Sequence, residues 1–367
     1  MNTDKITIYP IPAHTPEWYD FRRNGIGGSE AAIPMGLSKY GNPAKMFYEK
    51  LGLADPFIED NEKLFWGREL EAQIATKWQY YDGTPTGYLK NFAEDKLIRK
   101  CRKINGYAVN SDYPWLFSSP DRVINRKGGF KLTTGEPLEE EQGLEIKTME
   151  DFVSKQWESG IPVYHIVQVH EYMIVMEMDY YELVVLMNGR YFNVHPIDRN
   201  ENLCREIISV TKRFWYEHVE PAQPYAREFL LAQARGDTKA MERAQAMIQK
   251  YEPEPTAGES YKEFLSQRFT KKQDIVKPPA YLWSVAKRHK DMNAISNYFA
   301  DQKSLCANIL AKFLSDNGAD KIDFGTDRGF VHYQSRGGGV KFPDNRIKYK
   351  VDELQVIKTL SALNIEL

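Results

Sequence analysis

Cysteine is scarce in this sequence, and the few cysteines lie far apart. Cys101, Cys204 and Cys306 are the only three among 367 residues. An odd number at such wide spacing argues against a disulfide framework, a zinc ribbon and a four-cysteine iron–sulfur site. The chain is long enough to bury roughly three quarters of its unfolded surface. We therefore expect a hydrophobic core to stabilise it without cross-links, in a reducing intracellular compartment.

Long apolar runs and a large excess of one charge are absent as well. No stretch approaches the roughly 20 apolar residues that a membrane-spanning helix needs, and the first five residues lack the apolar core of a signal peptide. The net charge is −2, from 49 basic and 51 acidic residues. A balanced total still allows a local basic groove, so nucleic-acid binding stays open. A membrane partner is not expected.

The composition that is present is that of a folded protein. Hydrophobic residues make up 42% of the chain, aromatic residues 13% and charged residues 27%, which argues against a disordered or collagen-like chain. The length fits one large domain or two ordinary ones. Four tryptophans are expected in the core: Trp66, Trp78, Trp115 and Trp215.

Helical and extended patterns alternate over the first 220 residues, which predicts an α/β (α+β) fold. Apolar residues at helical spacing predict helices over 17–23, 43–52, 64–81, 161–178 and 203–219. Short runs broken by glycine and proline predict hairpin-like strands within 97–124 and one strand at 143–147. A hairpin over 181–195 should turn at Asn188-Gly189, a dipeptide that favours tight hairpin turns.

The composition shifts after Pro221 and Pro224. A polar helix follows, the Glu-Pro-Glu-Pro segment 252–255 predicts a linker, and 285–315 predicts one long helix. Along that helix one face recurs at three- and four-residue steps, at Ile295, Phe299, Gln302, Leu305, Ile309 and Phe313. Two short strands, at 321–324 and 330–335, complete the pattern. We predict a core domain over 1–225 and a helical C-terminal extension over 226–367 that ends in a small hairpin.

Two short acidic motifs carry the densest chemical signal. One is Ser119-Pro120-Asp121, and the other is Glu145-Ile146-Lys147. Asp121 and Glu145 are 24 residues apart, which suits neighbouring strands joined by a long loop. Alternate side chains of a strand share a face, so Glu145 and Lys147 should point the same way, where Asp121 can meet them.

Such a group suits metal-dependent hydrolysis of phosphodiester bonds. Two carboxylates and a backbone carbonyl, taken to be that of Ile146, offer the hard oxygen ligands that Mg²⁺ and Mn²⁺ prefer. Lys147 could orient or deprotonate the attacking water, or offset charge on a phosphate. Both motifs also arise by chance, and Glu-x-Lys on an exposed strand is often only a solvated charge pair. The surrounding sequence has to decide between a metal site and a chance match.

Four blocks of sequence surround these motifs: 18–31, with its Gly-Ile-Gly-Gly-Ser turn; 65–71; the Pro120-Asp121 and Glu145-Ile146-Lys147 pair; and 164–172. In content and order they resemble the phage-type exonucleases of the YqaJ and lambda exonuclease family, within the PD-(D/E)XK nuclease superfamily. The resemblance covers residues from about 15 to 220, and 226–367 matches less specifically.

The resemblance implies a PD-(D/E)XK restriction-endonuclease-like core, with a central mixed sheet flanked by helices, and a Mg²⁺ cofactor for which Mn²⁺ can substitute. It implies these roles: Asp121 and Glu145 as metal ligands, Lys147 as the catalytic lysine, Glu71 as an additional acidic residue near the metal, Gln168 as the glutamine that holds the site and the DNA, Tyr172 as the end of a Gln-x-x-x-Tyr pattern, and Arg22 with Ser29 as binders of a 5′ phosphate.

The glycine-rich turn through Gly28 fits that last role physically. A turn that leads into a helix presents backbone N–H groups and a positive dipole end to an anion, and Arg22 can add a bidentate grip. The chain departs from the family at Arg122, where glycine is common, although Arg122 could itself reach a phosphate. The acidic run 139–141 predicts a solvated loop. His165 and His170 do not have the spacing of a helical zinc site and are expected to be structural.

The leading hypothesis is a magnesium-dependent, 5′→3′ double-strand DNA exonuclease of phage-type homologous recombination. The resemblance further implies a cytoplasmic setting in a bacterium or a phage-infected cell, a homo-oligomer in the form of a trimeric ring, and a single-strand annealing protein as partner. A restriction- or repair-type endonuclease on the same fold is one alternative. A catalytically inactive DNA-binding assembly protein is another, against which the intact Asp121, Glu145 and Lys147 argue.

Overall fold

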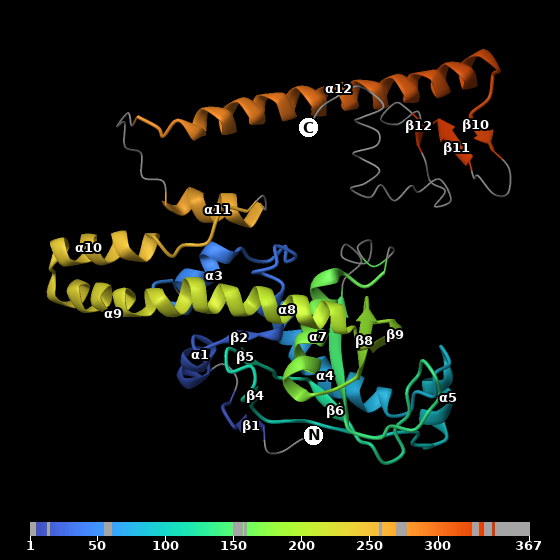
Figure 1. The fold of residues 1–367 in the computed structure, drawn as a ribbon. Coiled ribbons are helices and arrows are strands. Elements are labelled where there is room, and N and C mark those ends of the chain that lie inside the picture. The colour runs from blue at the N-terminus through green and yellow to red at the C-terminus, as the bar shows by residue number, and fades with distance from the viewer. Residues whose placement is uncertain are drawn as a thin grey trace. The chain divides into compact units, whose positions relative to one another are not determined.

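The computed structural model describes residues 5–12, 15–54, 61–149, 157, 160–256, 259–268, 277–324, 330–333 and 340–341. The chain forms two compact units, Met1–Thr270 and Lys271–Leu367 (Figure 1). The domain boundary expected at 225/226 stays a prediction. None of the helices in the described ranges combines the length and the hydropathy needed to cross a membrane.

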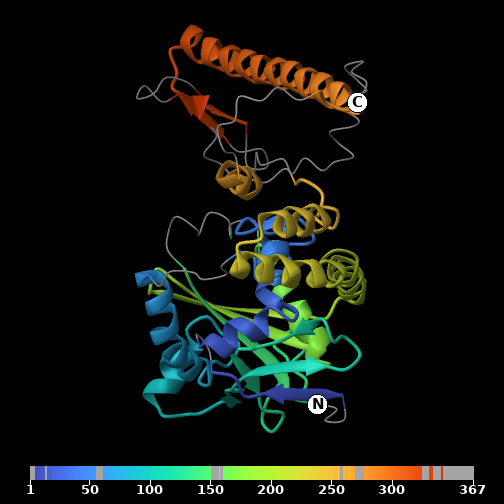
Figure 2. The same cartoon turned by 90° about the vertical axis from the view of Figure 1, so that its left-hand side faces the viewer.

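A five-stranded mixed sheet lies at the centre of the first unit, in the strand order β3-β6-β7-β8-β9 (Figures 1 and 2). The strands are β3 (Cys101–Arg102), β6 (Arg122–Ile124), β7 (Gln142–Met149), β8 (Tyr180–Met187) and β9 (Tyr191–Asp198). Strands β7 and β8 run parallel, and the other neighbours are antiparallel. The predicted α/β fold with a central mixed sheet is confirmed. The β8–β9 hairpin turns at Asn188 and Gly189, both with positive φ, as their sequence predicts.

Helices cover both faces of this sheet. One face packs against α7 (Val163–Met176), α8 (Glu201–Arg213) and the π-helical η1 (Phe214–Val219). The other face packs against α4 (Glu62–Trp78), with Leu144 and Ile146 of β7 buried beside Ile74 and Trp78. Because side chains alternate along a strand, Glu145 points to the opposite face, toward α7.

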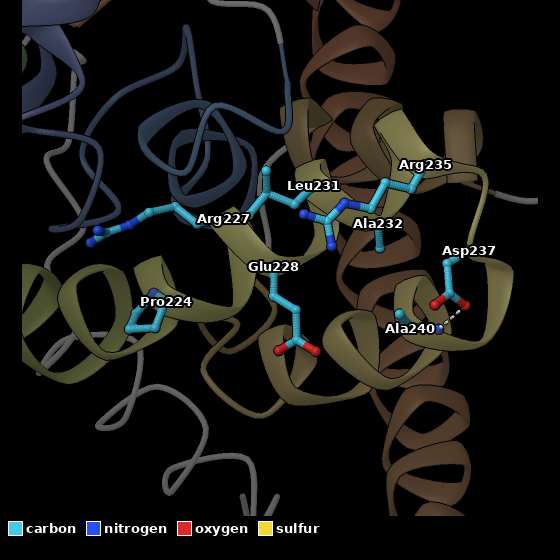
Figure 3. Close-up of a pocket in the computed structure, with 8 residues that line it drawn as sticks. All are labelled: Pro224, Arg227, Glu228, Leu231, Ala232, Arg235, Asp237 and Ala240. Carbon is cyan, nitrogen blue, oxygen red and sulfur yellow. Dashed lines mark hydrogen bonds between the residues drawn. The ribbon is translucent and has the colours of Figure 1, made fainter.

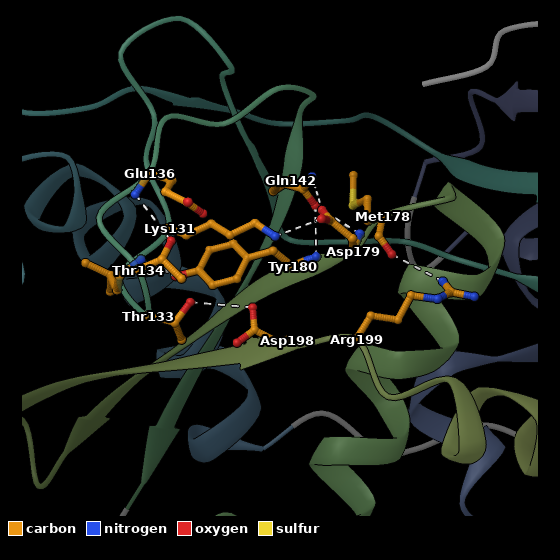
Figure 4. A network of polar contacts seen from close by, with 11 residues as sticks. Lys131, Thr133, Thr134, Glu136, Gln142, Met178, Asp179, Tyr180, Asp198 and Arg199 are labelled. Carbon is orange, nitrogen blue, oxygen red and sulfur yellow. Dashed lines mark hydrogen bonds and ion pairs between the residues drawn. The ribbon is translucent and has the colours of Figure 1, made fainter.

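A polar network holds β7 and β8 in register at the end where both strands begin (Figure 4). The side-chain oxygen of Gln142 accepts bonds from the backbone N–H groups of Asp179 (3.2 Å) and Tyr180 (3.0 Å). The side-chain amide of Gln142 donates to Asp179 (2.6 Å), which also pairs with Lys131 (2.7 Å). A slip of one residue would move Glu145 and Lys147 to the wrong face, so this network supports the position of the acidic motif.

The amino-terminal segment adds pairings that the sequence did not predict. Strand β1 (Ile6–Tyr9) pairs antiparallel with β4 (Tyr107–Asn110), and β2 (Ile26–Gly27) pairs in parallel with β5 (Leu116–Phe117). Within 97–124, β3 pairs antiparallel with β6 and Ala108 bridges Ser118, in line with the expected hairpin-like strands, while β4 and β5 pair in addition with these distant amino-terminal segments. Short helices α1 (Pro16–Arg22), α2 (Gly28–Ala31) and α3 (Pro43–Lys50) follow the predicted order. A further short helix, α5 (Gly87–Ala93), follows α4.

Helices α9 (Glu220–Arg235), α10 (Thr238–Gln249) and α11 (Glu259–Arg268) complete the first unit. The segment 252–255, predicted as a linker, packs on the core: the Tyr48 hydroxyl donates to Glu252 at 2.6 Å, and Pro253 is buried. Trp78, Trp115 and Trp215 are buried as predicted. The prediction for Trp66 is wrong, because it lies on the outer side of α4 and is 57% exposed.

The second unit contains α12 (Tyr281–Asp316), which confirms the predicted long helix. Strands β10 (Lys321–Asp323), β11 (Phe330–Tyr333) and β12 (Val340–Lys341) form a small antiparallel sheet, as the predicted terminal hairpin requires. Leu314 of α12 and Val331 of β11 are its buried side chains among the described residues.

Candidate active site

Asp121 and Glu145 meet where β6 begins beside β7. The β6–β7 register pairs Arg122 with Leu144, so Asp121 directly precedes the paired part of β6 and Glu145 directly follows that of β7. The backbone N–H of Ile146 donates a 2.8 Å hydrogen bond to Asp121 Oδ2. The sequence prediction that the two carboxylates meet is thus confirmed, with Asp121 at the entrance to β6 and Glu145 within β7.

The predicted third oxygen, the Ile146 carbonyl, lies just beyond the paired part of β6 and β7. The β6–β7 pairs end at Arg122 and Leu144, and the Ile146 N–H bonds the Asp121 side chain. Within a strand the N–H and the carbonyl of one residue point to the same side, so we expect the Ile146 carbonyl on the Asp121 side. Pro120, next to Asp121, has no backbone N–H to donate to it.

A chain of hydrogen bonds connects Glu145 to α7. Lys147 Nζ donates to Glu145 Oε1 at 2.6 Å, and the side-chain amide of Gln168 donates to the same oxygen at 2.8 Å. The other amide hydrogen of Gln168 reaches the Tyr172 hydroxyl at 3.0 Å. The four residues predicted as part of one site, Glu145, Lys147, Gln168 and Tyr172, are therefore in contact.

The electrostatics of this group favour a bound cation. Glu145 Oε2 is buried and has no hydrogen-bond partner among the described residues. Burial and the charge of Glu145 raise the pKa of Asp121 well above its ordinary value. Burial lowers the pKa of Lys147, but the carboxylates of Glu145 and Asp121 outweigh this and raise it, so Lys147 is a cation. Two close carboxylates with one oxygen unbonded fit a divalent metal ligand pair.

The predicted third acidic residue takes a different partner. The Glu71 carboxylate on α4 pairs with the Arg122 guanidinium and lies 3.5 Å from Lys103 Nζ. Arg122 also donates to the backbone carbonyl of Asp121 at 2.6 Å and is buried. Within the described ranges no three His, Cys, Asp or Glu side chains gather closely enough to hold a metal ion. Glu71 is thus near Asp121, whose pKa its charge raises, but it faces two cations of the protein.

Arg22 belongs to a second polar cluster, at the glycine-rich turn. Arg22 Nη2 lies 2.8 Å from Glu30 Oε1, and Lys50 Nζ lies 2.8 Å from Glu30 Oε2. Lys50 also donates to the Arg22 carbonyl at 2.6 Å, and Glu30 accepts from the Gly27 N–H at 3.0 Å. Burial favours the neutral form of Glu30, but the charges of Arg22 and Lys50 outweigh it and lower the pKa of Glu30 to about 2. Two cations share one carboxylate here, so one positive charge remains.

The turn itself packs against α7. A Cβ on Gly28 would lie 2.4 Å from the Tyr172 ring and 2.8 Å from the carboxylate of Glu171. Gly28 thus brings Ser29, which is exposed at the start of α2, close to the helix that carries Gln168. The role predicted for Gly28 in binding phosphate stays a prediction, and close packing is a second reason for glycine here.

Sequence reasoning missed three charged residues around this turn: Glu30, Lys50 and Glu171. Glu171 is fully buried, and neither of its carboxylate oxygens has a hydrogen-bond partner among the described residues. Burial and the nearby charge of Glu30 raise the pKa of Glu171 well above its usual value. Glu30 follows Ser29 directly and was readable in the first sequence block; Lys50 and Glu171 reach the turn only through tertiary packing.

The two histidines of α7 differ in their surroundings. His170 is satisfied: its Nδ1 lies 2.8 Å from the Ile166 carbonyl, and its Nε2 accepts from the Asn200 N–H at 3.1 Å. His165 stacks near Trp157, with ring centroids 5.5 Å apart. Burial and the charge of Lys147 lower the pKa of His165 to about 3, so it is a neutral ring at the edge of the site.

A pocket on α9 and α10 lies apart from these residues in sequence (Figure 3). Its volume is about 350 Å³, and it is lined by Pro224, Arg227, Glu228, Leu231, Ala232, Arg235, Asp237 and Ala240. It shares no residue with the Asp121–Glu145 group, and its side chains are mostly those of an exposed helical surface. The candidate active site therefore rests on the carboxylate pair.

Comparison with known proteins shows which family this chain resembles. Residues 17–179 match the YqaJ-like viral recombinase domain. The chain is 28% identical over 206 residues to the uncharacterized protein YqaJ of Bacillus subtilis, a match that covers 55% of this chain and 56% of the relative. The chain thus spans little more than half the length of that relative. The resemblance indicated by the four sequence blocks is confirmed.

Solved structures of exonucleases also show some similarity. An alkaline exonuclease from Laribacter hongkongensis, LHK-Exo, is 16% identical, with a TM-score of 0.39 and coverage of 63% of this chain and 98% of that one. Its complex with dAMP gives a TM-score of 0.41, at 16% identity and coverage of 60% and 98%. A phage related exonuclease from Haemophilus somnus gives 0.34, at 14% identity and coverage of 54% and 96%. Similarity of this size leaves the function of this chain to its own residues.

Proposed function

We propose that this chain is a divalent-metal-dependent deoxyribonuclease that hydrolyses phosphodiester bonds. One observation carries the proposal: Asp121 is bonded to the backbone of β7 beside Glu145, while Lys147 and Gln168 both bond Glu145 Oε1. The alternative interpretation of Glu-x-Lys is a solvated charge pair on the surface. That interpretation does not explain why Glu145 is buried with one unbonded oxygen. The YqaJ-like domain match over 17–179 supports the same activity.

The cation is proposed to be Mg²⁺, with Mn²⁺ as a substitute, held by Asp121, Glu145 and the Ile146 carbonyl. When bound, such an ion lowers the pKa of water and polarises the scissile phosphate. The residues of the chain do the rest. Lys147 places a positive charge beside the phosphate, and Gln168 keeps the Glu145 carboxylate oriented. Tyr172 supports Gln168 through the 3.0 Å contact with its amide.

The proposed substrate is duplex DNA, degraded in the 5′→3′ direction from an end. The Arg22, Glu30 and Lys50 cluster retains one net positive charge beside exposed Ser29, a setting suited to a terminal 5′ phosphate. The proposal includes, from family resemblance, a trimeric ring, a single-strand annealing protein as partner, and a cytoplasmic role in phage-type homologous recombination.

End dependence tests this function directly. Purified protein is incubated with Mg²⁺ and linear, nicked or covalently closed duplex of one sequence, and products are followed on a gel. We expect the linear duplex to be degraded and the closed circle to survive. Cleavage of the closed circle would favour the endonuclease alternative.

Variants connect that activity to the carboxylates. Asp121→Ala and Glu145→Ala should abolish degradation while DNA binding stays largely intact. Asp112→Ala is the matched control, because Asp112 is a half-exposed carboxylate that pairs with Lys5. Full activity in either of the first two variants would sink the assignment.

A further inference from the structure

The guanidinium of Arg122 lies beside the carboxylate of Glu71, the third acidic side chain of the site. Arg122 contacts Glu71 and the Asp121 carbonyl, and its side chain is only 10% exposed. Lys103 adds a second, more distant cation to Glu71. The Glu71 carboxylate is thus neutralised by the protein, unlike Glu145 Oε2, which is buried without a partner.

The charge balance of the site follows from these pairs. Asp121, Glu145 and Glu71 bring three negative charges, and Lys147, Arg122 and the more exposed Lys103 bring three positive ones. One divalent cation leaves a surplus of two positive charges, which a phosphodiester reduces to one. Two cations would leave a surplus of four and would place the second beside the Arg122 guanidinium. Two-metal sites hold their ions roughly 4 Å apart, which requires a bridging or neighbouring carboxylate that is free.

Resting on the proposed function, we propose that this site holds a single divalent cation, at Asp121 and Glu145, and that Arg122 takes the place of a second cation at Glu71. Arg122 is then a positioning residue: it fixes Glu71 and sets how many metal ions the site accepts. A chain with glycine at this position would leave Glu71 available as a ligand.

Counting bound metal tests the inference without an activity assay. Mn²⁺ is titrated into the full chain without DNA, and free Mn²⁺ is measured by electron paramagnetic resonance. We expect one site in the parent, and two sites in Arg122→Gly and in Arg122→Met. Glu71→Gln should leave the single site of the parent in place. Arg126→Gly, which removes an exposed arginine from a loop, should also bind one ion.

Each outcome decides the question. Two sites in the parent, or loss of the single site in Glu71→Gln, would overturn the inference and leave the proposed nuclease intact. One site in both Arg122 variants would show that Arg122 does not set the metal number. Absence of any site in the parent would overturn the proposed function and this inference together. A thermal melt of each variant confirms that it is folded.

An independent observation concerns α12, whose apolar side chains form a seven-residue repeat. The repeat runs at alternating four- and three-residue steps through Ile295, Phe299, Gln302, Cys306, Ile309 and Phe313. It continues backward to Met292; the next position of the repeat is the charged Arg288, and Val285 lies one step beyond it. Ile309 and Phe313 are 59% and 55% exposed, and Val285 is 56% exposed. A repeat sustained over about three heptads, here Met292 to Phe313, is the pattern of a coiled-coil seam.

Gln302, the polar residue within the stretch from Met292 to Phe313, selects the partner. In an antiparallel pair of these helices, Gln302 would face an apolar residue of the repeat in every register, which leaves its amide buried without a partner. In a parallel pair shifted by one heptad, Gln302 would face Ile295 or Ile309. Only the parallel pair in register puts Gln302 against Gln302 and each apolar side chain against its own kind.

We propose that α12 binds the α12 helix of a second copy of this chain, parallel and in register, so that in a trimeric ring the three α12 helices form one parallel bundle. Cys306 then faces its counterpart in the second copy. The opposite side of the helix, with small and polar residues such as Asn297 and Ser304, stays outside the seam.

Oxidative cross-linking of the full chain tests this arrangement. On non-reducing gels we expect a dimer band from the parent, its loss in Cys306→Ser, and its return in Cys306→Ser with Ile295→Cys. Cys306→Ser with Asn297→Cys is the outer-face control and should stay monomeric on the gel. No cross-link through Cys306, or equal cross-linking of the Asn297→Cys control, would overturn the proposal. If neither protein cross-links alone but a mixture of the parent with Cys306→Ser, Ile295→Cys does, the pair is antiparallel, which would also overturn the proposal.

Discussion

The backbone N–H of Ile146 donates a 2.8 Å hydrogen bond to Oδ2 of Asp121, and this bond joins the two acidic motifs of the chain. It holds the Asp121 carboxylate beside Glu145, although burial and the charge of Glu145 both oppose ionisation of Asp121. The candidate site is therefore strained electrostatically in favour of a cation, which has consequences for stability as well as for activity.

Neutralising Asp121 should stabilise the protein while it abolishes cleavage. Asp121→Asn removes the repulsion between two close carboxylates, and we expect a gain of about 1 kcal/mol in the free energy of unfolding in chelator. Thermal melts with EDTA and with Mg²⁺ check this. Mg²⁺ should raise the melting temperature of the parent and leave that of Asp121→Asn unchanged. A variant less stable than the parent in EDTA would contradict the electrostatic account.

Removal of the lysine should separate catalysis from folding. Lys147→Ala should lower turnover by at least a hundredfold, since a positioned ionisable group contributes about 10²–10⁴ in rate. Mg²⁺-dependent degradation of linear duplex measures the rate, and circular dichroism verifies the fold. Lys131→Ala is the control, because Lys131 pairs with Asp179 at the opposite end of β7 and β8. A parent-like rate in Lys147→Ala would make the lysine a mere charge partner of Glu145.

The end of the substrate should matter if Arg22 holds a terminal phosphate. A terminal phosphate carries nearly two negative charges at neutral pH, more than an internal diester. We expect phosphorylated 5′ ends to be degraded roughly ten- to a hundredfold faster than hydroxyl ends, and Arg22→Ala to erase that preference. Arg23→Ala is the neighbouring control, since Arg23 pairs with Asp20 on the surface. Equal rates on both ends in the parent would remove the phosphate pocket.

Acid should weaken the Arg22–Glu30–Lys50 cluster in a defined range. The pKa of Glu30 is lowered from 4.5 to about 2 in the fold, so its stabilising contribution is complete above pH 4.5 and is lost as the pH falls toward 2. That shift corresponds to roughly 3 kcal/mol.

Glu30→Gln should therefore be less stable than the parent at pH 7, and the gap should close between pH 4.5 and 2. Urea denaturation across this range is the measurement. Asp20→Asn, at an exposed carboxylate of the same region, should keep a constant difference from the parent. A Glu30→Gln gap that does not depend on pH would show that another group carries the effect.

Two glycines should respond oppositely to alanine. Gly28→Ala forces a methyl group within 2.4 Å of the Tyr172 ring and should destabilise the protein by about 1–3 kcal/mol. Gly67 lies inside α4, and the methyl group of Gly67→Ala would lie 3.5 Å from the Thr148 hydroxyl. This variant should stabilise the protein by about 0.5–1 kcal/mol. Chemical denaturation of the two variants measures the change in the free energy of unfolding for each. A neutral Gly28→Ala would show that the turn moves freely on α7.

Much of the site was predictable because it depends on local rules. The period of a strand places Glu145 and Lys147 on one face, and the distance from Asp121 suits an adjacent strand. The structure adds that the Ile146 N–H bonds the Asp121 side chain just beyond the last β6–β7 pair. Helix periodicity likewise placed α4, α7, α8 and α12 within a few residues.

Other features depended on contacts between distant segments. Strand β1 pairs with β4 across about 100 residues, and nothing in the short run Ile6–Tyr9 identifies that partner. Trp66 belongs to a helix as predicted. Whether its side chain is buried or exposed depends on which side of α4 packs against the sheet. The segment at Glu252 has the composition of a linker. It is bonded to the core because Tyr48 of α3 lies next to it in the folded chain.

By itself the sequence determined which residues make up the candidate site: a carboxylate pair, a lysine on the same strand face, and a glycine-rich turn with an arginine before it. These features follow from residue type and from the side-chain periods of two residues in a strand and 3.6 in a helix, which are local properties of the chain. Only the tertiary structure decided that Arg122 neutralises Glu71 and that Lys50 joins Arg22 at Glu30. Charges interact through space over a few ångströms, so their pairing is set by packing of remote elements and is invisible to spacing along the chain.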